Sequence, residues 1–258
     1  MKLQNQVVFA LALLGCGSMC AADDPFVGKW KLNADKSQFT GFREEIKDLG
    51  GNKYEFKFGD DTEMIVADGK QQPSKYGGTW AIKKDSANQW TETHEHGGKV
   101  TSTSTWMLSD DGNQLTIQTK GTRADGSSFT ENMSSKRVGS GSGLTGTWES
   151  TQAQFAIPDW EIKAWGTDGL SFTTPSENEH LDMKFDGKDY TDRGPRAAPG
   201  STSSGKRVDN HTIEMTDKMK GKVMDTSELK VSDDGKSLTL TMHFSGIEKP
   251  GIFVYEKQ

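Results

Sequence analysis

The sequence predicts an all-β protein made of two tandem antiparallel up-and-down β-barrels with little helix. Three observations support this prediction. Short segments with alternating apolar and polar residues fill the chain, Asp-Gly and Gly-Gly pairs separate them, and the same landmarks occur in both halves. The clearest repeat is LSDDGNQLTI at 108–117, which returns as VSDDGKSLTL at 231–240. Sequential hairpins of half-polar strands are typical of up-and-down barrels.

The repeated landmarks indicate a duplicated domain. Gly28-Lys29-Trp30 and Gly146-Thr147-Trp148 lie 118 residues apart, and the two Ser-Asp-Asp-Gly turns lie 123 residues apart. A duplicated unit of about 115 residues fits these landmarks and the β-rich end of each half. The sequence GSGSG at 139–143 has the composition of a short flexible linker. We therefore predict a signal peptide at 1–22, a first barrel at 23–138, a linker at 139–143 and a second barrel at 144–258.

Each half supplies its own series of strands. In both, the alternating segments are separated by turn residues that tolerate a positive φ angle, as tight hairpins require. The segment 42–49 (FREEIKDL) is left open between a short helix and a strand. The expected strands of the first half are 54–58, 63–66, 80–82, 89–93, 100–108 and 129–138. Those of the second half are 160–165, 181–185, 212–215, 223–231, 238–244 and 252–255.

The interior of these barrels has two interpretations. An eight-stranded barrel is just wide enough to be filled by side chains or to hold one small ligand. Serine and threonine are frequent in the expected strands, which fits either a wet lumen or a solvated outer face. The loop composition of 195–204 (PRAAPGSTSS) similarly fits either a mobile flap or a disordered insertion.

The first residues have the pattern of an export signal. Lys2 precedes the apolar stretch VVFALALL at 7–14, which is too short to span a bilayer as a helix. Small residues before Asp23 favour cleavage after Ala22, whereas Leu-Leu-Gly-Cys at 13–16 resembles a bacterial lipobox that would lipidate Cys16. The protein is therefore expected to be exported and periplasmic or extracellular, or alternatively lipid-anchored to the cell envelope, with no transmembrane span in the mature chain.

Composition excludes several classes of function. The net charge is −6 and no segment concentrates lysine or arginine, so a nucleic-acid partner is not expected. Both cysteines lie in the first 20 residues, so cleavage after Ala22 leaves no disulfide, thiolate metal site or catalytic thiol. No nucleophile elbow, His-Glu-x-x-His motif or cofactor-binding motif occurs, and we expect neither a cofactor nor an enzyme.

The opening FVGKWKL at 26–32 resembles the first strand of the lipocalin and fatty-acid-binding-protein (calycin) superfamily, which begins with Gly-x-Trp. Gly146 and Trp148 repeat this hallmark, and the ending VYEK at 254–257 is similar to the end of a fatty-acid-binding protein. The chain is thus identified as a tandem, exported relative of that superfamily. The resemblance implies a lipocalin-like barrel in each half.

The resemblance also implies residue roles. In that superfamily the tryptophan packs across the closed end of the barrel, often against a basic residue of the last strand. Arg137 is the expected partner of Trp30, and Lys257 is the nearest substitute beside Trp148. Fatty-acid-binding proteins hold a carboxylate with an arginine two residues before the terminal tyrosine. That position is Phe253 here, so the expected carboxylate clamp is missing from the second half.

Two groups of residues are candidates for a site. Tryptophans on the expected strands are interpreted as core or rim packing, or as the lining of a ligand cavity. His94 and His96 are two apart on a strand and so share one face, which makes them metal-ligand candidates, although no third ligand is identifiable. The tryptophan candidates are Trp80, Trp90, Trp106, Trp160 and Trp165.

Three functions stay open at this point. The first is non-catalytic binding of a small apolar or amphipathic molecule, which requires a hollow barrel. The second is a structural or interaction module of the cell envelope, with solid barrels that act through their outer faces. The third is an enzyme on the same scaffold, which a pocket with two converging ionisable side chains of perturbed titration would favour.

Overall fold

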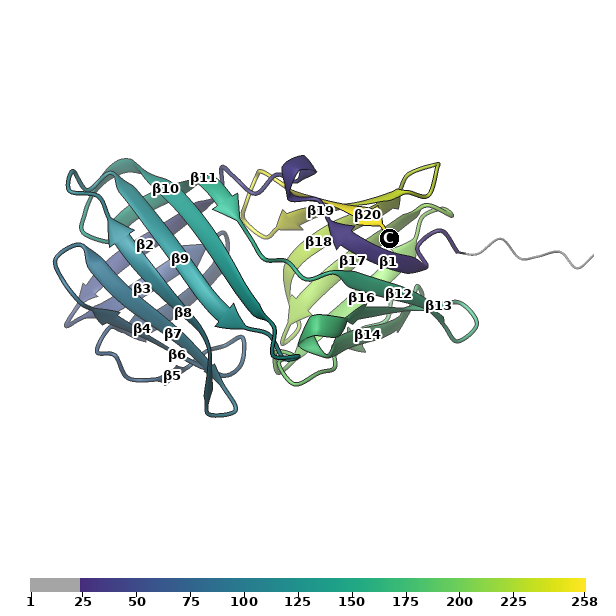
Figure 1. Ribbon diagram of the computed structural model, residues 1–258, viewed down its shortest axis with the longest axis horizontal. Coiled ribbons are helices and arrows are strands. Elements are labelled where there is room, and N and C mark those ends of the chain that lie inside the picture. The colour runs from purple at the N-terminus through teal and green to yellow at the C-terminus, as the bar shows by residue number, and fades with distance from the viewer. Residues whose placement is uncertain (1–23) are drawn as a thin grey trace, which may run out of the picture.

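The computed structural model describes residues 24–258 and contains two ten-stranded antiparallel sheets, each curled into a nearly closed barrel (Figure 1). This arrangement confirms the predicted all-β fold of two barrels. The predicted signal peptide, with Cys16 and both processing alternatives, lies outside the described residues. Within residues 24–258, no helix is long and apolar enough to cross a membrane.

Barrel 1 consists of strands β2 to β11, in the sheet order β4-β3-β2-β11-β10-β9-β8-β7-β6-β5. The segment left open between helix and strand is β2, and its Ile46 is fully buried in the core of barrel 1. The bounds are β2 Arg43–Gly50, β3 Lys53–Phe58, β4 Asp61–Val66, β5 Gln72–Pro73, β6 Thr79–Lys84, β7 Gln89–His96, β8 Lys99–Leu108, β9 Gln114–Thr122, β10 Ser128–Ser142 and β11 Thr145–Gln154.

Barrel 2 consists of β1 and β12 to β20, in the order β14-β13-β12-β1-β20-β19-β18-β17-β16-β15. Two short 3₁₀ helices, η1 (Ala34–Lys36) and η2 (Pro175–Glu177), lie in its connections. The bounds are β1 Gly28–Leu32, β12 Trp160–Trp165, β13 Gly169–Thr174, β14 Glu179–Lys184, β15 Tyr190–Thr191, β16 Ser201–Arg207, β17 Thr212–Met219, β18 Lys222–Val231, β19 Ser237–Phe244 and β20 Gly251–Lys257.

The repeated Ser-Asp-Asp-Gly turns have the same structure in both barrels. Ser109 Oγ donates a 2.6 Å hydrogen bond to Asp111, and Ser232 Oγ donates one of the same length to Asp234. The glycine that follows each pair adopts a positive φ, 71° at Gly112 and 68° at Gly235. Turn geometry therefore accounts for the repeated carboxylates.

The two halves of the chain exchange their first strands. Strand β1 pairs with β12 and β20 of barrel 2, whereas β11 pairs with β10 and β2 of barrel 1. Figure 1 shows β1, in purple, lying among the green and yellow strands of barrel 2. The barrels therefore do not follow the predicted ranges 23–138 and 144–258.

The exchange also changes the role of the predicted linker. Strand β10 extends through Ser142 and β11 begins at Thr145, so residues 139–143 form part of a hairpin within barrel 1. The chain crosses between barrels at two other places, residues 33–42 and residues 155–159. The sequence pattern did not distinguish these alternatives because either first strand presents the same Gly-x-Trp to a barrel.

The contacts between the Gly-x-Trp tryptophans and the basic residues of the last strands are exchanged in the same way. The Arg137 guanidinium lies 4.2 Å from the ring centroid of Trp148, and Lys257 Nζ lies 5.2 Å from that of Trp30. The predicted pairs, Arg137 with Trp30 and Lys257 with Trp148, are therefore wrong, although each tryptophan contacts one of the two predicted basic residues. Each of the two tryptophans is buried, and its indole donates a 2.8 Å hydrogen bond to a backbone carbonyl four residues earlier.

Ion pairs and aromatic contacts hold the barrels against each other. Glu177, beside barrel 2, accepts hydrogen bonds from Arg123 (3.1 Å) and from Arg196 (3.0 Å). Arg123 belongs to the β9–β10 turn of barrel 1, so this contact joins the two units. A second contact packs Phe42 and Phe58 against Phe244 of β19, with ring centroids 5.8 Å and 5.5 Å away.

The strand exchange predicts which residues cross-link. In the exchanged arrangement Lys29 is opposite Glu161, whereas without exchange it would take the place of Thr147, opposite Glu45. A chain starting at Asp23 has no cysteine of its own. We expect the variant Lys29→Cys, Glu161→Cys to form an intrachain disulfide, because directly opposed strand residues are within the reach of that bond. Peptide mass spectrometry after proteolysis under non-reducing conditions identifies the cross-link.

The matched control is Lys29→Cys, Glu45→Cys, which we expect to remain reduced under the same conditions. A disulfide in the control and none in the first variant would contradict the exchange. A disulfide between two chains of the first variant would mean that the exchange takes place between molecules.

Candidate functional site

The lumen of barrel 2 contains a cavity of about 250 Å³. Alternation along the strands turns Ile213, Met215 and Asp217 of β17 to the same inner face. Most of the wall is apolar, and a polar group lies at one end. The lining consists of Trp160, Phe172, Leu181, Met215, Leu229, Leu240 and Met242 with Thr174, Ser203, Ser227, Glu179, His180, Asp192 and Asp217.

A second cavity, of about 330 Å³, lies at the mouth of barrel 2. It is lined by residues of both barrels, including Phe58 and Tyr76 of barrel 1 and Phe244 of barrel 2. Asp192 and Asp217 line both cavities, so the lumen and the mouth meet at these carboxylates. Together the two spaces have the composition typical of small-molecule sites, which are mostly apolar with a few convergent polar groups.

A pair of aspartates occupies this junction. Asp217 of β17 and Asp225 of β18 are direct cross-strand partners. The Oδ1 atom of each is buried and has no hydrogen-bond partner. Burial raises the pKa of Asp225 to about 7, and the neighbouring Asp217 contributes through its charge and a hydrogen bond. Burial also raises the pKa of Asp217, to which the charge of Asp192 adds. Asp225 is therefore partly protonated near neutral pH, and burial disfavours ionisation of Asp217 as well.

Barrel 1 builds part of the mouth of barrel 2 through its β3–β4 hairpin. The backbone N–H of Asp60 donates to the carbonyl of Ser245 (3.0 Å), and Ser245 Oγ donates to Asp60 Oδ2 (2.9 Å). Lys222 Nζ of barrel 2 donates to the Asp60 carbonyl at 2.7 Å. A Cβ atom at Gly59 would lie 2.0 Å from the Ser245 carbonyl oxygen, so only glycine permits this approach.

The interior of barrel 1 carries a different polar group. Glu92 accepts a 2.9 Å hydrogen bond from the Trp106 indole and lies 2.8 Å from His94 Nε2. Burial lowers the pKa of His94, but the hydrogen bond and charge of Glu92 outweigh it and leave that pKa raised. Burial raises the pKa of Glu44 to about 7, and the charge of Glu92 contributes. This group lies among the large aromatic residues of the barrel 1 core.

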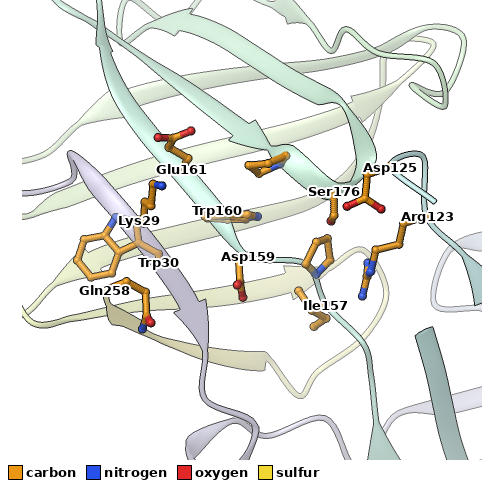
Figure 2. Close-up of a pocket in the computed structure, with 12 residues that line it drawn as sticks. Lys29, Trp30, Arg123, Asp125, Ile157, Asp159, Trp160, Glu161, Ser176 and Gln258 are labelled. Carbon is orange, nitrogen blue, oxygen red and sulfur yellow. The ribbon is translucent and has the colours of Figure 1, made fainter. Parts of the chain in front are cut away.

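Figure 2 shows a third space, a groove of about 540 Å³ outside barrel 2, beside β1 and β12. Several of its charged side chains have partners. Arg123 binds Glu177 and the Ala156 carbonyl, Asp125 accepts a hydrogen bond from Ser127, and Glu161 lies 3.2 Å from Lys163. Although it is larger, this groove is a weaker candidate than the cavities of barrel 2, which contain carboxyl oxygens without partners.

The predicted tryptophan candidates separate into two groups. Trp160 lines the barrel 2 cavity, stacked on Tyr255 with ring centroids 5.0 Å apart. Trp80, Trp90 and Trp106 are buried in the core cluster of barrel 1. Trp165 lies at the end of β12, edge-on to Tyr190, and does not line the cavity. Only Trp160 therefore belongs to the candidate site.

The two candidate metal ligands lie at the end of β7, where the pairing with β8 shifts by one residue because Thr101 of β8 is left without a partner in β7. His94 contacts Glu92 and stacks against Trp80. Within residues 24–258, no group of three or more metal-ligating side chains is present.

The sequence interpretation missed Asp217 and Asp225. The feature that could have identified them is an acidic residue at a strand position whose side chain the alternation directs into the barrel. Asp217 continues the inward series of Ile213 and Met215, and Asp225 begins the series that continues through Ser227, Leu229 and Val231. Comparison with protein-family models and with curated proteins finds no match for this chain.

Glu44 predicts a pH-dependent stability. Its pKa is raised from the usual 4.5 to about 7, so its ionisation opposes folding as pH rises through that interval. We expect Glu44→Gln to raise the free energy of unfolding more at pH 8 than at pH 4.5. The difference between the two effects should be on the order of 2–3 kcal/mol. Urea unfolding of a chain starting at Asp23, followed at both pH values, measures this difference.

The control is Glu45→Gln, which removes the same charge from the more exposed neighbouring position of β2. It should change stability by a similar amount at both pH values. An equal pH response of the two variants would mean that Glu44 ionises in the folded protein as it does in water.

Proposed function

We propose that the protein binds a small amphipathic molecule in the lumen of barrel 2 without changing it chemically. The observation that carries this proposal is the apolar cavity of about 250 Å³, which meets the mouth at a polar group. Burial of apolar ligand surface would supply most of the affinity, and the polar end would orient the ligand. The resemblance to the calycin superfamily and the predicted export signal agree with a carrier outside the cytoplasm.

The cavity favours ligand binding over an interaction module, because that alternative requires solid barrels. One observation favours the enzyme alternative. Asp217 and Asp225 both have raised pKa values and lie at the cavity, an arrangement suited to general acid–base catalysis. The two functions differ in the fate of the ligand. A ligand from a host extract that is recovered unchanged supports carriage, whereas conversion by the native protein and not by Asp217→Asn supports catalysis.

The proposal predicts saturable binding of simple amphiphiles. We expect at least one of three eight-carbon probes (1-octanol, octanoate or octylamine) to bind a chain starting at Asp23 with 1:1 stoichiometry in isothermal titration calorimetry. Ser227 is buried and lines the cavity, so Ser227→Phe should fill the space and weaken binding at least about tenfold.

Thr226→Phe is the matched control, since Thr226 is exposed on the outer face of the same strand. It should leave affinity unchanged. If none of the three probes binds at millimolar concentration, or if Ser227→Phe binds as well as the native protein, the lumen of barrel 2 is not a ligand site.

A further inference from the structure

The carboxyl pair of barrel 2 bears on the charge of the ligand, an inference that rests on the function proposed above. Asp217 and Asp225 lie where the lumen meets the mouth, so a molecule that occupies both spaces must pass beside them. Both carboxyls have a buried Oδ1 atom without a hydrogen-bond partner. A buried acceptor without a donor is costly, and the cost is greater for a charged group.

No basic side chain of the described residues 24–258 forms a salt bridge with this pair. The nearby lysines are engaged elsewhere, since Lys218 Nζ binds Asp189 at 2.7 Å and Lys222 Nζ binds the Asp60 carbonyl at 2.7 Å. Two further acidic residues, Glu179 and Asp192, line the same lumen. The lumen is therefore lined by three carboxyl groups and, among the residues that the structure describes, by no lysine or arginine.

The walls on both sides of the pair are apolar and aromatic. Trp160 and Phe172 lie on the lumen side, and Phe58, Tyr76 and Phe244 lie on the mouth side. Aromatic rings attract cations as well as apolar groups. An ammonium group offers three donors and a positive charge, which match what the two carboxyls lack.

We propose that the ligand of barrel 2 is an amine with an apolar substituent, whose ammonium group is held between Asp217 and Asp225. The positive charge of the ammonium group stabilises the ionised form of both carboxyls, which burial otherwise disfavours. The apolar substituent extends into the lumen, the mouth or both. Fatty acids are disfavoured, because their carboxylate would add a further negative charge beside two carboxyls that have no salt-bridge partner within residues 24–258.

The probe series tests this assignment because its members share one chain and differ only in the head group. We expect octylamine to bind at least about tenfold more tightly than 1-octanol, and octanoate to bind most weakly, in calorimetry at pH 8. Asp217→Asn and Asp225→Asn should remove this preference, so that octylamine binds no more tightly than 1-octanol to either variant. Glu214→Gln is the control, since it removes a carboxylate from the exposed side of β17.

The pH dependence of the native protein provides a second test that needs no substitution. Octylamine stays protonated between pH 5 and 8, whereas Asp225 has a pKa of about 7. The Kd of octylamine should rise as the pH falls below 7, by up to about tenfold per pH unit. The Kd of 1-octanol should not change over this range. The other titratable groups that line the two cavities are Asp192, Glu179 and His180 in the lumen and Asp60, Asp61, Tyr76, Lys218 and Lys222 at the mouth.

The outcomes separate the two proposals. Tight octylamine binding that depends on both aspartates and weakens at low pH supports the amine assignment. Equal affinity for 1-octanol and octylamine, or a preference for octanoate, overturns the amine assignment and leaves a binding site in barrel 2. Absence of binding by all three probes overturns both proposals. If either Asn variant unfolds, the head-group ranking and the pH dependence still decide between these outcomes.

Discussion

The pairing of β1 with β12 and β20 is the constraint on which the rest of the architecture depends. Because each barrel takes its first strand from the other half, the chain crosses between them twice, at residues 33–42 and 155–159. Two short crossings restrict rotation of one barrel relative to the other. The β3–β4 hairpin of barrel 1 is thereby held at the mouth of barrel 2, where Gly59 and Asp60 contact Ser245. One barrel thus completes the site of the other.

The duplicated barrels have diverged in their interiors. At the β7–β8 position where barrel 1 pairs His94 with Ser102, barrel 2 pairs Asp217 with Asp225. Glu44 of barrel 1 and Trp160 of barrel 2 likewise pair with the closing tryptophans of their barrels. Buried acids with raised pKa values reduce stability at neutral pH and are concentrated where proteins bind or react. The same scaffold therefore presents two chemically different interiors.

The sequence predicted most of the strands, the hairpin turns and the duplication, because these depend on local alternation and on residues such as Gly112 and Gly235. It missed β13, and it assigned the start of β16 to a flap or insertion. The strand exchange could not be predicted, since the exchanged and unexchanged arrangements bury the same tryptophans and form the same hydrogen-bond ladders. Of the candidate site, Trp160 was among the five tryptophans named. Asp217 and Asp225 were missed because an acid at an inward strand position becomes informative only when the cavity beside it is known.

The exchanged first strand has a consequence for folding. Strand β1 is made first, yet its partner β20 lies at the other end of the chain. During synthesis, barrel 1 can first be closed by β1, and β11 must later displace it if the observed arrangement is to form. Pairing between distant segments is slow, and a displaced or waiting edge strand can pair with another chain. The duplication therefore exposes this protein to a competition between two nearly equivalent assemblies, one with β1 in barrel 1 and the other with β1 in barrel 2.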